Sequence, residues 1–194
     1  MDDGRRTWAD GVLASTDAPP IHLAVEPTLT YLGVTELEIA GIALAERHHW
    51  VDARDGRLRR LLVAQFEHFL PSSTERYQYR LPDPVTLAGV TFGRWTFGYR
   101  LADASAPETA DTIAFLATRD LALEEEQLMA RYATIVDEEA RHELLLFFHE
   151  PLRRLGHALS SLVDDEGALR PEHAAVGTEL HARARRAFRL RSAG

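Results

Sequence analysis

The chain has 194 residues and a formal net charge of −8, and 45% of its residues are hydrophobic. This composition indicates a globular domain rather than a disordered chain, and the negative charge argues against nucleic acid as a main partner, because phosphate binding needs a basic face. Cysteine is absent, which excludes disulfides, iron–sulfur clusters and a cysteine nucleophile. A metal would have to be bound by Glu, Asp or His.

The N-terminal residues lack the apolar core of a signal peptide, and no stretch reaches the roughly 18 apolar residues of a membrane span. We therefore expect a cytoplasmic protein with no membrane contact. Residues 1–20 are expected to form an arm. A helical bundle domain is expected over 21–163, followed over 164–194 by a polar loop and a basic C-terminal helix that packs on the bundle.

Helical patterns dominate the first half of the chain. Thr35 and Glu38 match a capping box, which predicts a helix over 35–53. An Asp-Gly pair then ends this helix. A second helix is expected in the apolar run RLRRLLVAQFEHFL at 57–70.

The stretch 77–103 is compatible with two structures. Phe92, Trp95 and Tyr99 share one face of a helix, whereas Phe97 and Tyr99 alternate as in a strand. We favour a helix because the neighbouring segments are predicted to be helical.

The second half of the chain is also expected to be helical. Pro107 suits the first turn of a helix, and a turn is expected near Arg119 and Asp120. A further helix then extends to Glu150, where Pro151 ends or kinks it. Short connections between five to seven helices indicate a bundle.

Charged residues interrupt the apolar stripe of this last long helix. Steps of four and three residues from Leu128 pass through Glu139 and His142. A carboxylate buried there needs a cationic partner, a proton or a metal. A second Glu-x-x-His pair, Glu46 and His49, lies in the first predicted helix. Two such pairs and further carboxylates on other helices form the di-metal site of helical bundles.

The stretch TIVDEEARHE resembles the last metal-binding helix of ferritin-like, carboxylate-bridged di-iron proteins, especially acyl-carrier-protein desaturases and di-iron N-oxygenases. The resemblance covers roughly residues 107–150, and it extends more weakly to 35–50. It implies an all-α, ferritin-like helical bundle that holds a pair of iron ions and activates dioxygen.

The resemblance also implies a set of metal ligands. By matched motif, Glu139 would bridge the two ions and His142 would be a terminal ligand. Glu46 and His49 would play the same parts on the other side. Glu108 lies near the position of the acid that the preceding helix supplies in such proteins.

Several ligand choices stay open at this stage. An acid from the first helix could only be Asp10 or Asp17, and Asp103 would match the depth of Glu139 better than Glu108 does. An alternative register takes one acid from each of four helices, namely Glu36, Glu67, Glu108 and Glu139. His149 shares the face of His142 and is interpreted as a bystander.

The sequence thus predicts a non-haem di-iron oxidoreductase, with manganese as the alternative metal, that oxidises a small organic or carrier-bound substrate. A homodimer is compatible with this interpretation. The alternative is a metal-free bundle that acts as an interaction or regulatory module, with Glu139 and His142 as a buried polar pair. A third option is an enzyme with a helical pocket that uses His and Glu for acid–base chemistry without a metal.

Overall fold

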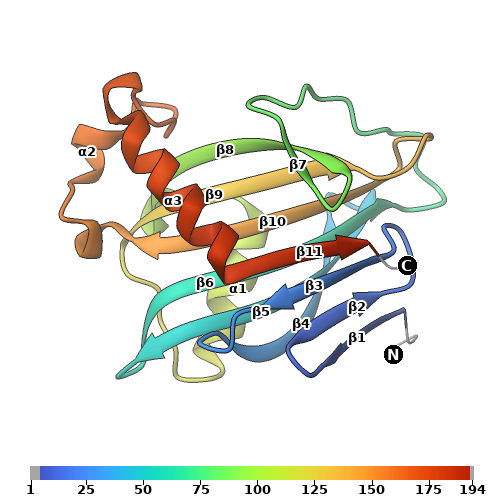
Figure 1. The fold of residues 1–194 in the computed structure, drawn as a ribbon, viewed down its shortest axis with the longest axis horizontal. Helices are drawn as coiled ribbons and strands as arrows, with labels where there is room; N and C mark the ends of the chain where they lie inside the picture. Colours follow the sequence, from blue (N-terminus) through green and yellow to red (C-terminus); the bar gives the residue numbers. More distant parts are fainter. Residues whose placement is uncertain (1–4, 193–194) are drawn as a thin grey trace.

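The computed structural model describes residues 5–192 and shows two antiparallel β-sheets packed face to face (Figure 1). The all-α, ferritin-like fold predicted from the sequence is therefore wrong, including the helical bundle. Residues 1–4 of the predicted N-terminal arm lie outside the described residues. The rest of that arm contributes two strands to the smaller sheet.

The larger sheet has seven strands in the order β4-β5-β6-β10-β9-β8-β7. The smaller sheet has four strands in the order β1-β2-β3-β11. The strands of the larger sheet are β4 Thr30–Ile39, β5 Ala43–Arg54, β6 Arg57–Phe69, β7 Val85–Leu87, β8 Val90–Arg100, β9 Glu126–Ile135 and β10 His142–Pro151. Those of the smaller sheet are β1 Arg6–Ala9, β2 Val12–Ser15, β3 Ile21–Val25 and β11 Phe188–Ser192.

Glycine-containing turns connect consecutive strands. Asp55 and Gly56 form the two-residue loop between β5 and β6, with φ angles of 53° and 75°. Asp10-Gly11 and Ala88-Gly89 make equivalent loops, also with positive φ at both positions. This is the turn geometry that fits the right-handed twist of paired strands. The Asp-Gly pair that was expected to end a helix therefore joins two strands.

The central strands of the larger sheet are buried on both faces. In β6, Leu62, Ala64 and Phe66 pack in the core between the sheets, while residues of the opposite parity, such as Leu61 and Val63, face away from the smaller sheet. A strand covered on both sides is apolar without alternation. The apolar run at 57–70 therefore resembled a helix.

The structure confirms that two of the predicted helices are present. Helix α1 (Pro107–Ala117) begins at the predicted proline and lies on the outer face of the larger sheet. Helix α3 (Ala174–Ala187) crosses the opposite face and runs directly into β11 (Figure 1). Within residues 5–192, the remaining helical segments are α2 (Leu159–Leu162) and three short 3-10 turns, Leu101–Asp103, Leu152–Leu155 and Pro171–His173.

The helix favoured for 77–103 is also wrong. This stretch contains the whole of β7 and β8, so the alternation of Phe97 and Tyr99 was the informative pattern. Within residues 5–192, no helix is long and apolar enough to cross a membrane.

Candidate active site

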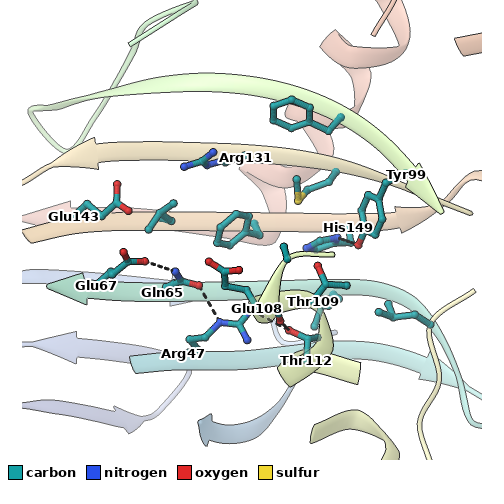
Figure 2. A pocket seen from close by; sticks show the side chains of 17 residues that line it. Arg47, Gln65, Glu67, Tyr99, Glu108, Thr109, Thr112, Arg131, Glu143 and His149 are labelled. Atoms are coloured by element: carbon teal, nitrogen blue, oxygen red, sulfur yellow. Dashed lines mark hydrogen bonds between the residues drawn. The ribbon is translucent and has the colours of Figure 1, made fainter. Parts of the chain in front are cut away.

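The outer face of the larger sheet holds a cavity of about 320 Å3 beside α1 (Figure 2). Strands β5, β6, β8, β9 and β10 supply its floor, and the first turns of α1 supply part of its wall. Its apolar lining comes from Leu61, Phe97, Met129, Leu145 and Phe147. Glu67 and Glu143 lie at one end, Tyr99 and His149 lie at the other, and further polar side chains such as Glu108 and Arg131 lie between them (Figure 2). An apolar lining with a few polar groups is typical of a small-molecule site.

Two glutamates face each other at one end of the cavity. Glu67 on β6 and Glu143 on β10 are direct cross-strand partners, and they are 9% and 5% exposed. Side chains in such positions start about 5 Å apart at Cβ. Burial raises the pKa of both carboxyls, and for Glu143, where the charge of Glu67 adds to this effect, it reaches about 7. The pair therefore retains one proton near neutral pH.

The hydrogen bonds distinguish the two carboxyls. Glu67 accepts hydrogen bonds from the Tyr77 hydroxyl at 2.8 Å and from Nε2 of Gln65 at 2.7 Å. Glu143 accepts one from the Tyr79 hydroxyl at 2.8 Å. Two donors stabilise an ionised Glu67 better than one donor stabilises an ionised Glu143, so the shared proton belongs on Glu143. Burial and the two acids raise the pKa of both tyrosines, which keeps their hydroxyls protonated as donors.

The two tyrosines lie on an irregular segment between β6 and β7. The guanidinium of Arg141 holds the start of this segment by donating to backbone carbonyls between residues 69 and 73. The carboxylate of Asp137 in turn accepts the backbone N–H of Arg141 and shapes the β9–β10 loop. The charged run DEEARH therefore supports the segment that places Tyr77 and Tyr79 on the acid pair.

Arg47 is a fixed part of the cavity wall. Its guanidinium is buried and donates to Asp111 at 2.6 Å, to Thr112 at 3.0 Å and to Gln65 at 2.9 Å. Since Asp111 and Thr112 belong to α1, these bonds attach the helix to β5 and β6. They also orient the Gln65 amide that donates to the acid pair.

Arg131 on β9 is held differently. Its guanidinium carbon lies 5.1 Å from the ring centroid of Trp95 and 6.0 Å from that of Phe147. Among residues 5–192 it makes no ion pair, and its buried Nε has no hydrogen-bond partner. Its positive charge nevertheless lowers the pKa of Glu143, although burial raises this pKa by more. The two groups therefore interact electrostatically across the cavity.

A histidine and a tyrosine mark the other end of the cavity (Figure 2). Nδ1 of His149 on β10 lies 3.0 Å from the hydroxyl of Tyr99 on β8. Burial lowers the pKa of His149 to about 3 and raises that of Tyr99, so both groups are neutral at physiological pH. His149, which was interpreted as a bystander, therefore lines the cavity.

The predicted ligands Glu46 and His49 lie on opposite faces of the larger sheet, because three residues along a strand reverse the side-chain direction. Glu46 accepts one hydrogen bond from Arg6 at 2.7 Å and pairs with His48 at 2.6 Å. His49 is fully buried, with its ring centroid 4.6 Å from that of Phe115 on α1.

The other predicted ligands are also apart. Glu139 is exposed in the β9–β10 loop, and His142 pairs with Asp137 at 2.7 Å and stacks on His68. Of the five predicted residues only Glu108 lines the cavity, together with Glu67 from the alternative register. The other open choices, Asp10, Asp17, Asp103 and Glu36, are not among the cavity-lining residues. Within residues 5–192, no group of three His, Asp or Glu side chains is placed to hold a metal ion.

Several residues of the cavity were missed at the sequence level. Glu143, Leu145, Phe147 and His149 occupy every second position of β10, which is the signal of one face of a strand. A helical interpretation distributes the same four side chains around the axis.

Comparison with protein-family models, with curated proteins and with solved structures finds no match to this chain. The resemblance to ferritin-like di-iron proteins is therefore not supported by any family match, and the β-sheet fold contradicts it. Function has to be inferred from the cavity itself.

Proposed function

We propose that this protein is an enzyme that moves protons on a small organic molecule bound in the cavity. The observation that carries the proposal is the buried, directly opposed pair of Glu67 and Glu143, each bonded to a tyrosine hydroxyl. A carboxyl with a pKa of about 7, such as that of Glu143, suits general acid–base catalysis at neutral pH.

The roles of the two acids follow from their hydrogen bonds. Ionised Glu67 would accept a proton from the substrate, and protonated Glu143 would donate one at another atom. The pair then returns to one proton by transfer between its members, so no net acid or base is consumed. An isomerisation or an elimination has this balance. The apolar side chains in the middle of the cavity would hold the body of the substrate and limit access of water.

The di-metal oxidoreductase predicted from the sequence relied on two ligand pairs placed on helices. In the structure these residues lie on strands or in a loop. The oxidoreductase stays an untested prediction, as do the cytoplasmic location, the homodimer and the carrier-bound substrate. Acid–base chemistry by Glu without a metal, which the sequence left as a third option, agrees better with the cavity.

Proton transfer to carbon can be tested before the natural substrate is known. Small ketones, aldehydes and carboxylic acids would be incubated with the protein in D2O, and deuterium incorporation would be followed by proton NMR. We expect at least one compound to exchange, with a rate that falls about 100-fold or more in Glu67→Gln and in Glu143→Gln. Equal exchange by wild type and both variants would contradict the proposal.

A binding or carrier protein is the second candidate. The apolar lining of the cavity favours it, because such a lining can hold a ligand without chemistry. Tight binding of a compound that the protein never converts or exchanges would support the carrier.

A further inference from the structure

We infer that the ligand of this cavity carries a carboxylate or a similar small anionic group, and that this group pairs with Arg131. The inference names the substrate class of the proposed site and rests on the proposed function for its location. Two arginines, Arg47 and Arg131, line this cavity, and they differ in their partners.

Arg47 already has its partners. Three hydrogen bonds and the carboxylate of Asp111 occupy its guanidinium, so it has little capacity left for a ligand. Arg131 has none of these within the described residues, and its Nε is buried without a hydrogen-bond partner. A buried polar group without a partner is costly, and a bound ligand that supplied an acceptor would remove this cost.

The surroundings of Arg131 preserve its capacity to bind. Trp95 and Phe147 lie near its guanidinium and stabilise its charge without accepting a conventional hydrogen bond. Three acids share the cavity with Arg131, namely Glu67, Glu108 and Glu143. Among the described residues none of them lies within ion-pair distance of its guanidinium, so they do not neutralise it by direct contact.

The geometry of the guanidinium suits a carboxylate. Its planar fork can donate two parallel hydrogen bonds to the two oxygens of one acid group. The rest of such a ligand would extend along the apolar lining, toward the end marked by His149 and Tyr99 (Figure 2). A small carboxylic acid with an aliphatic or aromatic body has this shape and polarity.

Matched pairs of probes test the inference by isothermal titration calorimetry. Phenylacetate would be compared with phenylacetamide, and hexanoate with hexanamide, because each pair differs only in the anionic group. We expect the carboxylates to bind more tightly than the amides and to lose about 10- to 100-fold in affinity in Arg131→Gln. Arg131→Lys keeps the charge without the fork and should recover only part of this loss.

Arg94→Gln is the matched control, since it removes a β8 arginine that pairs with Asp83 and does not line the cavity. It should leave carboxylate affinity unchanged, and circular dichroism would verify that all variants are folded. Equal affinity for amides and carboxylates would overturn the inference. So would the absence of carboxylate binding at millimolar concentration, or unchanged binding in a folded Arg131→Gln.

Failure of the inference and failure of the proposed function have different signatures. If carboxylates bind through Arg131 but Glu67→Gln and Glu143→Gln do not affect any deuterium exchange, the site binds anions without acid–base catalysis. If deuterium exchange requires the two glutamates but occurs only with neutral compounds, the proposed acid–base activity is present and Arg131 does not bind an anionic group of the substrate.

Discussion

Glu67 and Glu143 stand directly opposite each other on adjacent antiparallel strands, buried at one end of a cavity. Like charges in this position repel, and the sheet holds both side chains in place. The protein keeps them there with tyrosine donors and with one retained proton. A pair that costs folding free energy when fully ionised is more easily explained by function than by stability.

Replacement of Glu143 by Gln should stabilise the protein above neutral pH. Between pH 4.5 and about 7 the folded chain retains a proton on Glu143 that the unfolded chain has released. The free energy of unfolding of the wild type therefore falls as the pH rises through this interval, by up to about 3 kcal/mol. Glu143→Gln should remove the part of this fall that comes from Glu143 while keeping an acceptor for Tyr79.

The measurement is urea denaturation of wild type and Glu143→Gln at pH 4.5, 6 and 8. The difference between them should grow with pH in favour of the variant. Glu139→Gln, which removes an exposed carboxylate from the β9–β10 loop, is the control and should behave like the wild type. A difference that is the same at all three pH values would show that the two glutamates do not share a proton.

Replacement of Arg47 by Met should loosen α1. The variant leaves Asp111 and Gln65 without their guanidinium partner and removes the main polar link between the helix and the sheet. Loss of one member of a buried ion pair costs about 3 kcal/mol, and the partial exposure of Asp111 reduces this value.

Hydrogen exchange of the backbone amides of α1 tests this link directly. Exchange over 107–117 should accelerate in Arg47→Met more than exchange in β10. Arg119→Met is the comparison, because Arg119 also connects α1 to the sheet, through the carbonyls of Phe115 and Leu32, but is exposed. Its loss should have the smaller effect. Unchanged protection of α1 in Arg47→Met would show that apolar packing alone holds the helix.

The hairpins and α1 could have been predicted from the sequence. Asp55-Gly56 is a strong signal for a two-residue hairpin, and Pro107 correctly indicated the start of a helix. The strands around the hairpin could not be recognised by alternation, since β6 is buried on both faces and its apolar residues are consecutive. Local patterns therefore favoured a helix where the sheet is most deeply buried.

The prediction of the site depended on the same choice between helical and strand periodicity. In a helix, a spacing of three residues places Glu46 and His49 on one face, whereas in β5 it places them on opposite faces. The pairing of Glu67 with Glu143 joins segments far apart in the chain, so no local pattern could reveal it. The register between β6 and β10 had to be known first.

Replacement of His49 by Leu should stabilise the protein, most strongly at acidic pH. Burial lowers the pKa of His49 to about 3, and both of its ring nitrogens are buried without a hydrogen-bond partner among the described residues. The unfolded chain binds a proton at this histidine below about pH 6.5 and the folded chain does not, so the protein becomes less stable as the pH is lowered. At pH 5 the protonation effect alone is about 2 kcal/mol.

Thermal denaturation of wild type and His49→Leu at pH 5 and pH 8 measures this effect. The variant should be more stable at both values, with the larger gain at pH 5. His157→Leu, at an exposed position, is the control and should show no such dependence. A destabilised variant at both pH values would mean that His49 makes a contact that leucine cannot replace.

His149 should remain neutral and carry its proton on Nε2 throughout the range in which the protein is folded. Burial places its pKa at about 3, and the Tyr99 hydroxyl, whose own pKa is raised, is the natural donor to Nδ1. Nitrogen-15 NMR of histidine-labelled protein between pH 5 and 8 should show one neutral ring with this tautomer. In Tyr99→Phe the bond is lost, and the Nδ1–H tautomer should become populated. A cationic His149 at pH 6 would instead require a carboxylate next to it, and the far end of the cavity would then be a second charged site.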